Sequence, residues 1–92
     1  MDTLSQIASK IIKEQMLIIG PLALVEAKKV SGLTVDSGTG DIVLSGDKSD
    51  ILNKLVSQYE HLFGRASREV CREAALSLVA ELPQSEVPAN LR

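Results

Sequence analysis

The sequence is poor in aromatic side chains, with one tyrosine, one phenylalanine and no tryptophan among its 92 residues. A core without large rings must consist of Leu, Ile, Val and Ala, which suits closely packed helices. Ten basic and twelve acidic residues give a net charge of −2, so the chain also lacks a basic excess. We therefore do not expect a nucleic acid to be bound through general attraction to phosphate.

Cysteine is equally scarce, because Cys71 stands alone and excludes a disulfide framework within the chain. No basic start followed by an apolar block marks a signal peptide. The longest apolar block, 16–25, is much shorter than the roughly 20 residues that cross a membrane. These absences favour a single small domain in the cytoplasm, with no membrane partner.

The chain is organised around the stretch from Leu17 to Lys29, where Gly20-Pro21 interrupts an apolar run. Glycine takes the left-handed conformation that ends many helices, and proline fits the first turn of a new helix. We expect one helix to end near Ile19 and the next to begin at Pro21. The large apolar residues on both arms predict that this corner is buried.

A second stretch, 61–73, echoes the first at a distance of 44 positions, as from Gly20 to Gly64. The identical pairs are Ser5 with Ser49, Ile7 with Ile51, Lys10 with Lys54, and Gly20 with Gly64. The echo predicts two helix-corner-helix units joined by a middle segment. Since Arg65 rather than proline follows Gly64, the sequence leaves open whether Gly64 breaks or only kinks the second unit, and chance similarity stays an alternative.

Apolar residues with helical spacing predict four helices. A capping-box pattern from Thr3 to Gln6 predicts the start of the first helix, and Asp47 and Ser49 are alternative N-caps of the third. The expected bounds are 3–19, 21–30, Asp47 or Ser49 to Phe63, and 66–82.

The middle segment favours β-structure, since the runs 33–36 and 41–44 flank a turn at Ser37-Gly38-Thr39-Gly40. A two-stranded hairpin is marginal in water, so this one must lie on the helices or pair with another chain. The predicted fold is a mainly helical α+β domain over 1–82, in the order α-α-β-β-α-α, with a central hairpin at about 33–45. Residues 83–92 are expected to form a flexible tail.

No set of residues carries convincing catalytic or metal-binding chemistry. The run 33–39 resembles the apolar-Asp-Ser/Thr-Gly core of retroviral-type aspartic proteases, but those proteins are almost wholly β, so we interpret Asp36 as a turn residue. The run 38–40 lacks the spacing and the lysine of a phosphate loop. His61 is the only histidine, and Cys71 lies on an apolar helix face. We expect no enzyme, cofactor or metal.

The second predicted helix is apolar around most of its circumference and needs a cover. We expect a homodimer or higher oligomer in which the strand edge of the hairpin adds to this helix. The predicted interface residues are Leu22, Leu24, Val25, Ile42 and Leu44.

Three arginines, Arg65, Arg68 and Arg72, lie along one side of the fourth predicted helix, with Glu69 and Glu73 between them. Their spacing predicts a solvated ladder of weak ion pairs. The alternative is a face for an anionic partner, which a DNA-binding regulator with a helix-turn-helix-like corner would use.

The segment Ile19-Gly20-Pro21-Leu22-Ala23, with Val25 and Ala27 following, resembles the helical breaks of small modules appended to bacterial signalling and regulatory proteins. The resemblance covers only this corner, and the second unit lacks the proline. It implies a non-catalytic interaction module and assigns no functional residue. We therefore expect a self-associating regulatory or scaffold domain whose partners are itself and another protein.

Overall fold

The computed structural model describes residues 2–36 and 38–92. Within them the chain forms four α-helices, one antiparallel hairpin and two short 3-10 turns, which confirms the predicted mainly helical α+β fold. The elements are α1 (Thr3–Ile19), α2 (Leu22–Ala27), β1 (Leu33–Val35), β2 (Ile42–Leu44), α3 (Lys48–Phe63), α4 (Arg65–Val79), η1 (Gln84–Glu86) and η2 (Ala89–Leu91).

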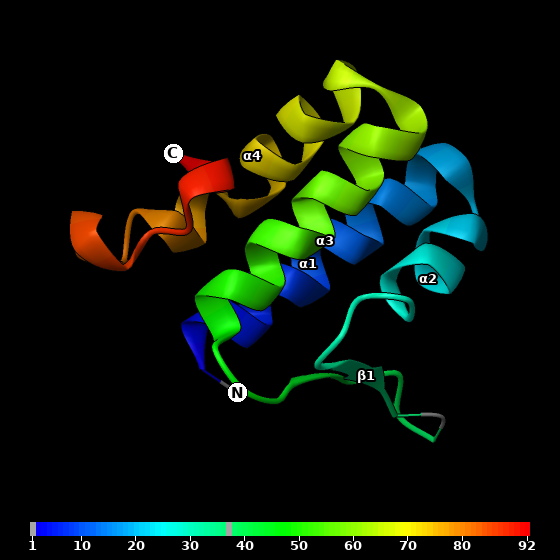
Figure 1. Cartoon of the computed structure of the whole chain (residues 1–92), viewed down its shortest axis with the longest axis horizontal. Helices are drawn as coiled ribbons and strands as arrows, with labels where there is room; N and C mark the ends of the chain where they lie inside the picture. Colours follow the sequence, from blue (N-terminus) through cyan, green and yellow to red (C-terminus); the bar gives the residue numbers. More distant parts are fainter. Residues whose placement is uncertain (1, 37) are drawn as a thin grey trace.

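Helices α1 and α3 run in the same direction, and α4 folds back beside them (Figure 1). Helix α2 returns from the end of α1 and packs on α1 and α3. The hairpin contacts α1 through β2, so it lies on the helices of its own chain. The two helix corners therefore lie at one end of the molecule, opposite the start of α1.

The apolar core is aliphatic apart from Tyr59 and Cys71, and Tyr59 is fully buried. The Tyr59 hydroxyl donates a hydrogen bond of 2.7 Å to the carbonyl oxygen of Ala23, and this bond ties α3 to α2. Burial raises the pKa of Tyr59 because the charged phenolate would be poorly solvated there. The ring thus fills the core while its one polar atom is satisfied.

Helices α1 and α3 each begin on an aspartate. Asp2 accepts a hydrogen bond of 2.8 Å from the backbone N–H of Ser5, so the N-cap of α1 is Asp2 and the predicted Thr3 capping box is wrong. Asp47 caps α3 in the same way. A hydrogen bond from Lys48 to Asp2 joins the starts of the two helices and, with the Ser5 bond, lowers the pKa of Asp2 to about 2.

Both corners use a glycine in the same manner. The φ angles are +69° at Gly20 and +90° at Gly64, with extended ψ values that essentially only glycine adopts. Each glycine N–H bonds the carbonyl four residues back, Met16 at 2.9 Å and Glu60 at 2.8 Å. Gly64 therefore breaks the second unit even without a proline. The second arms differ, because α2 has 6 residues and α4 has 15.

The hairpin pairs Leu33 with Leu44 and Val35 with Ile42. Leu33, Ile42 and Leu44 point into the core and are almost fully buried. The side chains of Ile42 and Leu44 are therefore covered by their own chain and cannot form the predicted interface, whereas pairing of the strand edge with another chain stays a prediction.

Asp36 begins the turn between the strands. Its Oδ1 accepts backbone N–H bonds from Gly38 at 2.7 Å and Thr39 at 3.1 Å. These bonds favour the ionised carboxylate and lower the pKa of Asp36. The bonds support the interpretation of Asp36 as a turn residue. Ser37, which was part of that prediction, lies outside the described residues.

The predicted flexible tail is instead packed. Val87 and Leu91 are buried against the helices, and Asn90 fastens the segment to α3. The Asn90 N–H donates to Asn53 Oδ1 at 2.9 Å, and its Nδ2 donates to the Asn53 carbonyl at 2.8 Å and to Ser57 Oγ at 3.0 Å. We call these three bonds the tail latch. The apolar and polar contacts together offset the entropy lost when the segment is ordered.

Candidate functional site

Exposed large apolar side chains gather at the corner between α1 and α2. Of the eight such residues in the described part of the chain, five lie at the end of α1 or in α2. Leu17 is 80% exposed and Ile18 is 61% exposed. These five, together with Leu62 of α3, form what we call the corner surface: Met16, Leu17, Ile18, Leu22, Val25 and Leu62.

Leu62 reaches this end because α2 runs back along α3 (Figure 1). Gln58 Nε2 donates a hydrogen bond of 2.9 Å to Glu26 Oε1, which sets the two helices side by side. Leu22 lies about one turn before Glu26, and Leu62 lies about one turn after Gln58. The two leucines therefore lie at the same end of the α2–α3 pair.

The predicted burial of the corner is wrong for a geometric reason. Successive residues of a helix turn by about 100°, so Leu17 lies on the side of α1 opposite the buried stripe that includes Ile11 and Gln15. In α2 the small residues Ala23 and Ala27 fill the contact with the core. Because alanine lets the helices approach closely, the larger residues of α2 are turned outward.

The predicted interface residues of α2 thus divide into two kinds. Leu22 and Val25 are exposed, whereas Leu24 is half-buried and packs against the core. The predicted interface did not include Leu17, Ile18 or Leu62, which the structure leaves exposed. A helical wheel of α1 would have separated Leu17 from the core stripe, but no local pattern marks the position of Leu62.

A buried carboxylate fixes the orientation of α2. Glu26 accepts hydrogen bonds from Lys29 Nζ at 3.0 Å and from Gln58 Nε2. The Lys29 bond, followed by the Gln58 bond, lowers the pKa of Glu26 and keeps it ionised at neutral pH. With the Tyr59 bond, these contacts hold Leu22 and Val25 on the surface before any partner binds.

Two of the three arginines of α4, Arg68 and Arg72, are balanced by acidic groups. Arg72 pairs with Glu69 at 3.3 Å, as the predicted ladder requires. Arg68 instead lies 3.7 Å from Glu60 of α3 and donates to Asn90 Oδ1 at 3.5 Å. Arg65 is exposed at the first turn of the helix.

Cys71 lies between α1 and α4, fully buried. Gln15 Nε2 donates to the Ser67 carbonyl at 3.0 Å and to Cys71 Sγ at 3.5 Å. Burial raises the pKa of Cys71 to about 11, so the thiol is protonated and inert at neutral pH. His61 is exposed near the end of α3. No cluster of metal-ligating side chains occurs among residues 2–36 and 38–92.

None of the helices in the described part of the chain is long and apolar enough to cross a membrane. In comparisons with known proteins, no family model matches the chain, and no curated protein or solved structure matches it significantly.

Proposed function

We propose that this protein is a non-catalytic interaction module that self-associates through the corner surface. The observation that carries the proposal is the gathering of six exposed large apolar residues at one end of the molecule. Soluble monomers rarely expose a contiguous apolar patch, and such a patch usually marks an interface. Removing these side chains from water supplies the driving force for association.

A second copy is the simplest partner. In a two-fold dimer the same patch meets itself, so one apolar surface is sufficient for both sides of the interface. Helix α2 is held by Tyr59 and by the bonds to Glu26, so its exposed residues are ordered in advance. Such preorganisation lowers the entropy lost on binding.

The alternative function, DNA binding by a helix-turn-helix-like corner, has less support. A phosphate-binding face needs cationic groups that are free to replace counterions. Arg68 and Arg72 are engaged by Glu60 and Glu69, and the chain is acidic overall. These ion pairs favour a protein partner over a nucleic acid.

Sedimentation equilibrium at micromolar concentration tests the proposal with a matched pair of variants. Val25 is 50% exposed in the corner surface, and Val43 is 48% exposed on the hairpin. We expect Val25→Glu to weaken association at least tenfold, because it places a carboxylate in the apolar contact. Val43→Glu should associate like the wild type. Equal masses for all three proteins, or a wild type that stays monomeric, would refute the proposal.

A further inference from the structure

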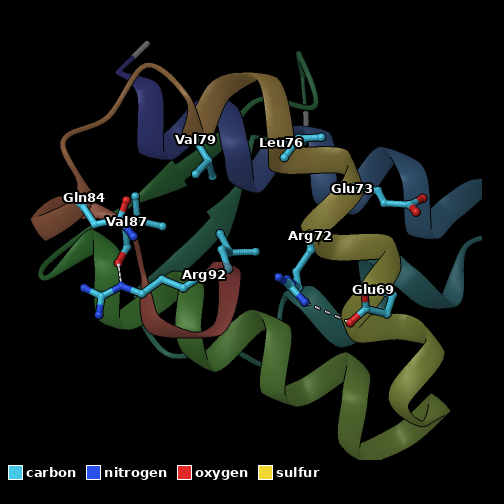
Figure 2. A pocket seen from close by; sticks show the side chains of 9 residues that line it. Glu69, Arg72, Glu73, Leu76, Val79, Gln84, Val87 and Arg92 are labelled. Atoms are coloured by element: carbon cyan, nitrogen blue, oxygen red, sulfur yellow. Dashed lines mark hydrogen bonds and ion pairs between the residues drawn. The ribbon is translucent and has the colours of Figure 1, made fainter.

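Helix α4 and the tail line a pocket of about 380 Å³ (Figure 2). Its apolar lining consists of Leu76 and Val79 from α4 and Val87 and Leu91 from the tail. Val87 and Leu91 are buried and form the floor, whereas Leu76 is 69% exposed. The exposed Leu76 side chain therefore lies beside the apolar floor of the pocket.

The charged residues of this pocket are divided between its ends. Figure 2 shows Glu69 and Glu73 at one end and the guanidinium of Arg92 at the other. Arg72 is engaged by Glu69 at 3.3 Å. Arg92 donates through Nε to the Val87 carbonyl at 3.2 Å, which holds its guanidinium at the end of the pocket away from Glu69 (Figure 2). The surface is thus acidic at one end, apolar in the middle and basic at the other end.

We propose that a second copy of this chain occupies the pocket, with the two α4 helices antiparallel about a two-fold axis near Leu76. A protrusion beside a hollow is self-complementary under a two-fold rotation. Each Leu76 then enters the hollow of the other copy, where it contacts Val79, Val87 and Leu91. The exposed leucine and the apolar floor are covered in one step.

The charged residues at the two ends of the pocket are complementary to those of a second copy. In this arrangement the two-fold axis passes near Leu76 of both antiparallel α4 helices. Glu73 lies three residues before Leu76 and Val79 lies three residues after it, so Glu73 of one copy lies opposite Val79 of the other. Val79 lies toward the tail end of the pocket, where Arg92 is (Figure 2). Glu73 therefore meets Arg92 of the other copy at both ends of the contact. Opposite charges arranged in this way fix the register of an interface, whereas like charges would repel.

This inference rests on the proposed function and extends it, because each chain then carries two separate self-contacts. A standard interface takes about 800 Å² from each partner, so two of them use roughly 30% of the 5208 Å² surface of the chain. The pocket lining and the corner surface have no residue in common, so one contact does not use up the side chains of the other. Two such contacts join dimers into tetramers or longer chains.

Sedimentation velocity of the full chain, from micromolar to near-millimolar concentration, tests the second contact. We expect the wild type to exceed the mass of a dimer. Leu76→Glu should stop at a dimer through the corner surface, and Val25→Glu should stop at a dimer through the pocket. The double variant should be monomeric. Ser77→Glu, an exposed neighbour outside the pocket lining, should behave like the wild type.

A charge exchange gives an independent test. Glu73→Arg should weaken the α4 contact at least tenfold, and adding Arg92→Glu should restore it. All substituted side chains are exposed, and circular dichroism confirms that each variant is folded. If Leu76→Glu assembles like the wild type, the pocket inference fails and the proposed function stands. If Val25→Glu changes nothing while Leu76→Glu gives monomers, the proposed function fails and the pocket contact stands. A wild type that stays monomeric overturns both.

Discussion

Cys71 is held at a position where folding strongly disfavours ionisation of the thiol. Burial raises the pKa of Cys71 from its ordinary value of 9.0 to about 11, so the folded state resists losing a proton that the unfolded chain loses more easily. Stability from this source is complete below pH 9 and is lost as the pH rises toward 11. We expect urea unfolding to show about 1 kcal/mol less stability at pH 10 than at pH 8 from this thiol alone.

The variant Cys71→Ala separates the thiol from other alkaline effects, because it removes the ionising group and leaves Tyr59 in place. Its stability should decline less between pH 8 and 10 than that of the wild type. The thiol should also react slowly with a disulfide reagent at pH 8 and rapidly in denaturant. Fast reaction of the native protein would show that Cys71 is accessible.

At the scale of single residues, the sequence predicted the chemical role of a side chain better than its exposure to solvent. Cys71 was expected on an apolar face and Asp36 in a turn, because both assignments depend on near neighbours in the chain. The exposure of Leu62 and the burial of Ile42 depend on which face a neighbouring element covers. That information lies in contacts between distant segments, so apolar character alone could not distinguish an interface from the core.

At the scale of elements, two glycines allow the energetic cost of backbone strain to be compared with the cost of a steric clash. Gly20 and Gly32 both have positive φ angles, +69° and +89°. A Cβ at Gly20 meets nothing within 4 Å, whereas at Gly32 it would lie 2.8 Å from the Ser45 carbonyl oxygen and from Ile51 Cδ1. We expect Gly20→Ala to cost about 1–3 kcal/mol of unfolding free energy from backbone strain alone.

Gly32→Ala should cost more than Gly20→Ala, since the clash with the Ser45 backbone adds to the strain. Gly40, with a φ of +78° and nothing within 4 Å of an added Cβ, is the uncrowded control, and Gly40→Ala should cost about as much as Gly20→Ala. Chemical denaturation of the three variants gives the order. A Gly20→Ala variant as stable as the wild type would show that the corner tolerates a side chain.

The tail latch gives a second prediction for an element. Asn90→Ala removes two side-chain hydrogen bonds to α3 and leaves the Asn53 carbonyl with one partner fewer. We expect a loss of about 1–3 kcal/mol, concentrated in the tail. Hydrogen exchange at the Val87 and Leu91 amides should accelerate more than exchange in α3. The exposed Ser85→Ala is the control, and equal exchange in both variants would contradict the latch.

Most elements were predictable from local signals, whereas the tail was not. Helical spacing gave α1 its observed bounds, and Gly20-Pro21 marked its end. The tail contains two prolines and few apolar residues, so local signals favour disorder. It is ordered by bonds between Asn90 and Asn53, 37 positions apart, and no local pattern reports such a contact.

For the whole molecule, we expect the proposed self-association to make thermal stability depend on protein concentration. Assembly stabilises only the folded state, so the melting temperature of the wild type should rise as the concentration increases. The variant that combines Val25→Glu with Leu76→Glu should melt at the same temperature at all concentrations. Differential scanning calorimetry over a hundredfold range measures both. A wild-type melting temperature that does not change would indicate a monomer.

The tail latch described above has a consequence for regulation. The tail forms the floor of the pocket. Opening of the tail is therefore thermodynamically coupled to release of a second copy bound there. If binding of the second copy stabilises the closed tail by a given free energy, closure of the tail strengthens binding of that copy by the same free energy. A ligand or modification that pulled residues 83–92 off α3 would therefore break the pocket contact and leave dimers joined through the corner surface.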